Sequence, residues 1–87
     1  MKVEKKLVVK PKQGLHARPA AMFVECANKF KSKIRVRKDD TVVDGKSILN
    51  ILMLGVECGD EILIEVEGED AEQAIKELEG IVSRDDI

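Results

Sequence analysis

The sequence predicts an α+β fold with the element order β-α-β-β-α-β-α, in which three helices cover one face of a four-stranded antiparallel sheet. Four stretches alternate apolar with polar residues, which is the period of a half-buried strand, and three others repeat apolar residues at helical spacing. Short hairpins favour antiparallel pairing, and each amphipathic helix needs an apolar surface to cover. One sheet with all helices on one side satisfies both requirements.

The first half of the chain is predicted to form a strand, a helix and a hairpin. Residues 2–10 alternate and end before a proline, and a helix follows over about 17–29. Residues 33–37 alternate again, and Asp39-Asp40 supply turn chemistry before a short strand around 41–43. The residues expected to point into the core are Val3, Leu7, Val9, Ala20, Phe23, Val24, Ala27, Phe30, Ile34 and Val36.

The second half is predicted to form a short helix, a strand and a longer helix. Ser47 can cap a helix over 48–53, which Gly55 can end in a left-handed conformation. Residues 61–67 alternate as a fourth strand. The segment Asp70-Ala71-Glu72-Gln73 resembles a capping box at the start of the last helix. The inner residues would be Ile62, Ile64, Val66, Ala71, Ala74, Ile75, Leu78 and Val82.

Composition restricts the class of protein. The 87 residues allow one compact domain, and the net charge of −2 with no Tyr or Trp disfavours a nucleic-acid partner. The longest uncharged run, 47–56, is too short to span a membrane, so we expect a cytoplasmic protein with no membrane insertion. Cys26 and Cys58 lack the spacing of a disulfide scaffold or zinc site, and we interpret both as reduced, small apolar residues.

The segment GLHARPA, residues 14–20, contains the only histidine of the chain. If the first helix begins near residue 17, His16 lies at its N-cap, where backbone N–H groups have no partner within the helix and favour an anion. Arg18 adds a forked set of donors suited to phosphoryl oxygens, and Pro19 is tolerated in the first turn. Neutral imidazole is a competent nucleophile, so the segment predicts a phosphohistidine site.

The histidine has two other interpretations. A lone histidine at a helix start more often caps or decorates the helix, but here glycine, arginine and proline within six positions favour phosphate chemistry. No second carboxylate, cysteine or histidine accompanies the segment in the sequence, which disfavours a metal site or a hydrolase.

Through these residues the sequence resembles the HPr phosphocarriers of the bacterial phosphoenolpyruvate-dependent sugar phosphotransferase system. The match covers the whole chain, including the segment 14–20 and a second signature, Lys46-Ser47-Ile48-Leu49 through Leu54-Gly55. The resemblance implies one domain, residues 1–87, with an open-faced β-sandwich fold. It also implies that His16 accepts a phosphoryl group on Nδ1 from enzyme I, charged by phosphoenolpyruvate, and passes it to IIA components of sugar permeases. Arg18 would stabilise the transferring group, in a monomer that needs no cofactor or metal and is a carrier rather than a turnover enzyme.

The resemblance extends to regulation and docking. Ser47 corresponds to the serine that HPr kinase/phosphorylase modifies in many bacteria, and a catabolite-control transcription factor is a further partner of such forms; Ser47 could also be only an N-cap. The stretch ILNILML is apolar nearly all round, so some residues must be exposed. We expect Ile51 and Leu54 to be buried and Ile48, Leu49 and Leu52 to bind partners.

Three residues, Gln13, Glu25 and Asn50, depart from those common in the family and bear on partner choice. Two alternatives to a sugar carrier stay open at this point. One is an HPr-like regulatory protein of a nitrogen-type or catabolite-control pathway. The other is an anion-binding or nucleic-acid-binding α+β module without covalent chemistry.

Overall fold

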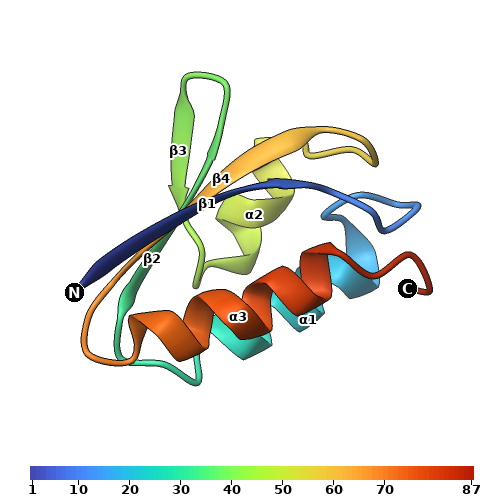
Figure 1. Cartoon of the computed structure of the whole chain (residues 1–87). Coiled ribbons are helices and arrows are strands. Elements are labelled where there is room, and N and C mark those ends of the chain that lie inside the picture. Colours follow the sequence, from blue (N-terminus) through green and yellow to red (C-terminus); the bar gives the residue numbers. More distant parts are fainter.

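A computed structural model describes all residues from Met1 to Ile87. One four-stranded sheet carries three helices on one side (Figure 1). The elements are β1 (Lys2–Val8), α1 (Ala17–Ala27), β2 (Lys33–Lys38), β3 (Thr41–Asp44), α2 (Ile48–Leu54), β4 (Glu61–Glu67) and α3 (Ala71–Val82). The predicted fold class and element order are confirmed.

The sheet has the order β1-β4-β2-β3, and every neighbouring pair is antiparallel. β4 therefore lies in the middle, where Ile64 pairs with Lys5 of β1 and with Val36 of β2. α1 and α3 lie side by side beneath the sheet, and α2 packs between α1 and β3 (Figure 1). The end of the chain lies close to the start of α1 in the same view.

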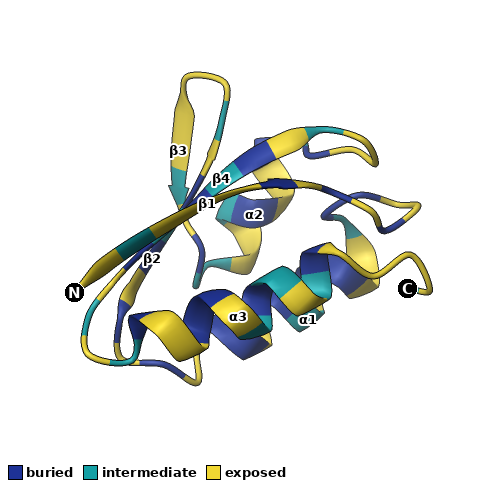
Figure 2. Ribbon diagram, viewed as in Figure 1, coloured by how far each residue is buried: buried dark blue, intermediate teal, exposed yellow.

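The core fills the space between sheet and helices and is almost entirely aliphatic (Figure 2). Alternate residues of the strands supply one side of it, as their period requires. The apolar stripes of α1 and α3 supply the other side. The fully buried large side chains are Phe23, Leu15, Ile34, Ile51, Ile62, Ile64, Leu78, Val9, Val36, Val56, Val66 and Val82.

β2, β3 and α2 end one residue later than predicted, and two other elements end two residues earlier. β1 ends at Val8 rather than at residue 10, because Val9 exchanges backbone hydrogen bonds with Gly59 and Asp60 in a loop instead of continuing along β4. α1 ends at Ala27 rather than at residue 29, because the side chain of Asn28 donates to the carbonyl groups of Val24 and Lys46 and closes the last turn.

The predicted capping box at the start of α3 is wrong. Asp70 occupies the N-cap position but makes no capping hydrogen bond with its own helix. Its carboxylate instead accepts from the backbone N–H groups of Lys31 and Ser32 and from the Ser32 hydroxyl. Gln73 donates to Glu77 one turn further on. The two side chains therefore serve tertiary and helix-surface contacts rather than each other's backbone.

Both cysteines are free thiols, as the sequence indicates, but only one of them is buried. Cys26 is buried, and this burial raises the pKa of its thiol. Cys58 is exposed and lies in the loop between α2 and β4, with Sγ 3.5 Å from the carbonyl oxygen of Lys10. None of the three helices is long and apolar enough to cross a membrane.

Candidate functional site

The loop that leads into α1 is fastened to the loop that follows α2. The N–H of Leu15 donates to the carbonyl oxygen of Val56 over 3.0 Å, and both side chains are fully buried. Gly14 has φ +68, and a Cβ at this position would overlap the same carbonyl oxygen. Only glycine fits this position, because of its positive φ and because the neighbouring backbone leaves no room for a Cβ. The hydrogen bond from Leu15 holds the two loops in contact.

His16 is the N-cap residue of α1, as predicted, with extended backbone angles of φ −123° and ψ 165°. Its side chain makes no hydrogen bond to the helix start, and it remains 36% exposed. The imidazole is therefore not used as a cap. It projects beside N–H groups that the helix itself leaves without partners.

The first residue of α1 has an uncommon backbone conformation. Ala17 has φ +48, in the left-handed region that residues with a Cβ rarely adopt. Such a conformation costs on the order of 1–3 kcal/mol and is found most often at functional sites. Pro19, two residues later, is buried and makes no demand for a hydrogen bond in the first turn. The backbone at His16 is thus fixed by tight local geometry.

A carboxylate that the sequence analysis missed lies against His16. Oε2 of Glu57 is 2.6 Å from Nε2 of the imidazole, although the two residues are 41 positions apart. The statement that no carboxylate accompanies the segment is therefore wrong in three dimensions. No local pattern marks Glu57, because its approach depends on the pairing of two loops that are separate in the sequence.

Arg18 is exposed at the first turn of α1, and no hydrogen bond or ion pair engages its guanidinium. Its charge still reaches the end of the chain. The pKa of Asp86 is held below its usual value, first by hydrogen bonding to Arg84 and, more weakly, by the charge of Arg18. Arg18 therefore lies at the surface, two residues after His16, and all the N–H groups of its guanidinium are free to bind an anion.

Ser47 and α2 form a second feature of the surface. The hydroxyl of Ser47 accepts a hydrogen bond from the N–H of Asn50 over 3.3 Å, which confirms the predicted N-cap, and Gly55 ends the helix with φ +70. Ile51 and Leu54 are buried, as expected. The exposed apolar side chains, which we call the α2 patch, are Ile48, Leu49, Leu52 and Met53.

Met53 is the most exposed member of the α2 patch, at 73%, and the sequence analysis did not select it. The other three members are those expected from sequence to bind partners, and they are 38–63% exposed. Phe23, which the helical pattern assigns to the core, is fully buried. Exposed apolar side chains that gather in one patch are typical of surfaces that bind another molecule.

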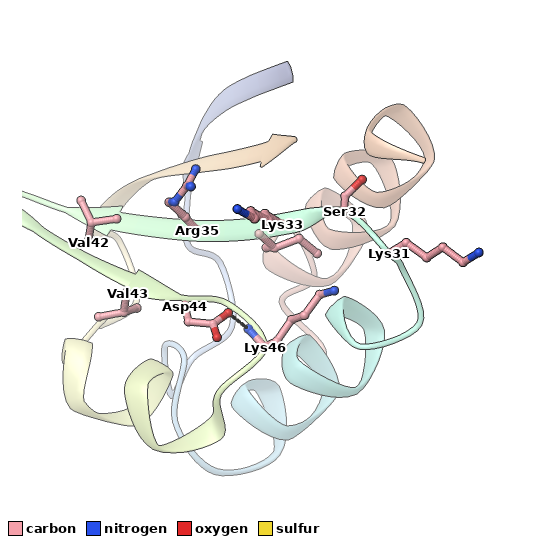
Figure 3. A pocket seen from close by; sticks show the side chains of 9 residues that line it. Lys31, Ser32, Lys33, Arg35, Val42, Val43, Asp44 and Lys46 are labelled. Carbon is pink, nitrogen blue, oxygen red and sulfur yellow. Dashed lines mark hydrogen bonds between the residues drawn. The ribbon is translucent and has the colours of Figure 1, made fainter. Parts of the chain in front are cut away.

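A cleft of about 460 Å³ lies elsewhere, between β2, β3 and the segment that precedes α2 (Figure 3). Two of its basic side chains, Lys46 and Arg35, have partners within the chain. Lys46 donates from its backbone to Asp44 and from Nζ to the carbonyl oxygen of Phe30, and Arg35 lies 4.0 Å from Glu67. Neither His16 nor Arg18 lines this cleft or any of the three others, so the candidate site is an open surface rather than a pocket.

Comparison with known proteins places this fold and helix start in one class, the small phosphocarriers. A family model described as "PTS HPr component phosphorylation site" matches residues 3–84. The HPr-like protein Crh of Bacillus subtilis is 40% identical, over 95% of this chain and 98% of its own. The phosphocarrier protein HPr of Haloferax volcanii is 41% identical, over 93% of each chain.

A solved structure agrees with the sequence comparisons. The crystal structure of an HPr phosphocarrier from Bacillus anthracis superposes with a TM-score of 0.92 at 44% identity, over 94% of this chain and 98% of the other. The chain belongs to the HPr family of the phosphotransferase system.

Proposed function

We propose that this protein is a phosphocarrier whose His16 accepts a phosphoryl group on Nδ1 from enzyme I, which phosphoenolpyruvate charges, and passes it to IIA components of sugar permeases. The observation that supports this most is the position of the ring. The imidazole stands at the N-cap of α1, makes no hydrogen bond to the helix and is 36% exposed. A nucleophile in this position can reach phosphorus on another protein.

The surroundings of the ring suit a phosphoryl group that must be held and then released. Unpaired N–H groups and the dipole at the start of α1 attract the negative oxygens, and the free guanidinium of Arg18 can donate to two of them. Because the site is open, these interactions are partly screened by water, and the group is not trapped. The chain acts as a covalent intermediate, without a cofactor of its own.

The α2 patch is the proposed docking surface for enzyme I and the IIA components. It lies on the helix that packs against α1, so a partner seated on it would approach the same side of the molecule as His16. We propose that residues 1–87 act as one domain and a monomer in the cytoplasm.

Regulation through Ser47 is part of the proposal. A phosphate on this hydroxyl would stand at a helix start, which tolerates it, and would add about −2 of charge beside the α2 patch. HPr kinase/phosphorylase would supply it. The similarity to the HPr-like protein Crh favours a second candidate function, a regulator of catabolite control rather than a sugar carrier.

One experiment separates these functions. The protein is incubated with enzyme I and phosphoenolpyruvate, then with a IIA protein, and separately with HPr kinase and ATP. We expect acid-labile phosphate on the wild type and on Ser47→Ala, none on His16→Ala, and transfer to IIA. Labelling at Ser47 without labelling at His16 would instead favour the regulatory function, and no labelling in either reaction would exclude both.

A further inference from the structure

The carboxylate of Glu57 lies 2.6 Å from Nε2 of His16 and leaves Nδ1 without a partner. We propose that Glu57 is a positioning residue for phosphoryl transfer: it holds the Nε2–H of the imidazole, and thereby presents the lone pair of Nδ1 to the incoming phosphorus. This inference rests on the proposed function, because it assigns a role to Glu57 only if His16 is the phosphoryl acceptor.

The Glu57 side chain is 65% exposed, but the backbone that carries it is fixed by hydrogen bonds within the fold. The N–H of Glu57 donates to Asp60 over 2.8 Å, and Lys38 reaches both Asp60, at 3.1 Å, and the carbonyl oxygen of Gly55, at 2.7 Å. These bonds, first that from Glu57, hold the pKa of Asp60 below its usual value, so its carboxylate stays charged. The loop that carries Glu57 is therefore closed on itself.

The other side of the contact is fixed as well. The loop before His16 is tied to the residue that precedes Glu57, because Leu15 donates to Val56. Gly59 and Asp60 exchange backbone hydrogen bonds with Val9, at the end of β1. Both partners of the pair thus stand on backbone segments that are hydrogen-bonded to each other. A ring held in this way loses little freedom when a partner protein docks.

The chemistry of the pair follows from its donors and acceptors. An ionised carboxylate only accepts hydrogen bonds, so the ring nitrogen beside Glu57 must carry the hydrogen. In a neutral imidazole the other nitrogen, Nδ1, then has the lone pair. In metal-binding histidines, a carboxylate that accepts from the ring nitrogen not bound to the metal fixes the tautomer and the orientation of the ring in the same manner. Here the electrophile is phosphorus instead of a metal ion.

During the transfer one N–P bond forms and another breaks, and the hydrogen on Nε2 of His16 stays in place. The lone pair of Nδ1 forms an N–P bond with the phosphohistidine of the donor protein, and the electron pair of the broken bond returns to the donor imidazole. The His16 ring now bears a positive charge, because it holds both the phosphoryl group and the Nε2 hydrogen, and the carboxylate of Glu57 lies against that charge. Release to an acceptor reverses the step and leaves a neutral ring.

The test compares Glu57→Ala and Glu57→Gln with a matched control, Glu69→Ala, which removes an exposed carboxylate without a hydrogen-bond partner. Phosphorylation by limiting enzyme I and phosphoenolpyruvate gives the transfer rate. Nuclear magnetic resonance of ¹⁵N-labelled protein reports the Nε2–H proton of the ring. Outer partners of this kind typically contribute about 10–100-fold, and exposure at this site places the effect near the lower limit.

We expect Glu57→Ala to lose the Nε2–H resonance and to accept phosphate roughly tenfold more slowly. Glu57→Gln should keep the resonance, since its amide oxygen still accepts, and should lose only about threefold. Glu69→Ala should match the wild type. An unchanged rate in Glu57→Ala, or an equal loss in Glu69→Ala, overturns the role of Glu57. Failure of the wild-type chain itself to take up phosphate overturns the proposed function instead.

Discussion

The carboxylate of Asp70 joins two elements that are distant in the sequence, because it accepts hydrogen bonds from both the backbone and the hydroxyl of Ser32, 38 residues earlier. It also accepts from the N–H of Lys31, at 2.9 Å. Ser32 is the one buried polar residue of the chain, at 1% exposure, so its hydroxyl has little access to water. The start of α3 is thereby fastened to the start of β2.

This contact predicts a specific loss of stability in acid. The hydrogen bonds, first that from the Ser32 hydroxyl and then that from Lys31, lower the pKa of Asp70 in the folded state. Their contribution is therefore fully present above the unfolded pKa, near 3.9, and disappears as the pH falls through the folded value. We expect Asp70→Asn to lower the melting temperature at neutral pH, and the difference from wild type to shrink below about pH 4.

Thermal unfolding followed by circular dichroism from neutral pH to about pH 2.5 measures this difference. Glu69→Gln is the control, because this neighbouring side chain is exposed and has no hydrogen-bond partner. A constant difference between Asp70→Asn and wild type across the whole range would show that the charge of the carboxylate is not what Ser32 and Lys31 recognise.

The fold follows from local patterns to a large extent, because alternation and helical spacing report directly which face of each element is buried. The stripe of α3 and the inner residues of β4 are buried as predicted. Element ends are less accessible to this reasoning. The end of α1 depends on Asn28 reaching the carbonyl group of Lys46, a contact that exists only after the chain has folded.

Some residues of the candidate site are likewise predictable from local sequence, and others are not. His16 and its N-cap position follow from the segment 14–20, since the determinants are adjacent in the chain. Glu57 and the partners of Asp70 do not, because each depends on which loops or elements meet in space. Asp70 also shows how a local motif misleads: the residue types of a capping box are present, but a buried serine competes successfully for the carboxylate.

Gly14 is predicted to be indispensable for both stability and the site. Gly14→Ala would place a Cβ against the backbone of Val56 and Glu57 at a positive φ, and neither backbone can yield easily. We expect the free energy of unfolding to fall by at least about 2 kcal/mol in urea denaturation. Gly80→Ala is the matched control: it lies on α3 in open space, and should raise stability by about 1 kcal/mol.

The Gly14 variant also tests whether the two loops position the histidine. The rate of transfer from enzyme I is measured at a low temperature, at which Gly14→Ala is still folded. We expect this rate to be lower than that of the wild type, because the hydrogen bond from Leu15 to Val56 would be displaced. Full stability in Gly14→Ala would contradict the close approach of these backbones.

Two substitutions separate the structural and regulatory roles of Ser47. Ser47→Ala removes the acceptor for the Asn50 N–H and should lower the free energy of unfolding by about 1 kcal/mol, with transfer from enzyme I retained. Ser47→Asp keeps a capping oxygen, so its stability should stay near wild type. Its negative charge beside the α2 patch should nevertheless slow transfer. Equal transfer rates in the two variants would indicate that Ser47 serves only as a cap.

The α2 patch is predicted to supply most of the apolar contact with enzyme I. Leu49 and Met53 are 63% and 73% exposed, so replacing either by glutamate creates no cavity and should leave the melting temperature nearly unchanged. A charge at the centre of an apolar interface should weaken docking by roughly 1–2 kcal/mol, seen as about a tenfold higher concentration of this protein for half-maximal transfer. Val8→Glu, at an exposed apolar position of β1, should have little effect. An equal loss in Val8→Glu would attribute the weakening to net charge alone, and a loss limited to Leu49 would exclude Met53 from the interface.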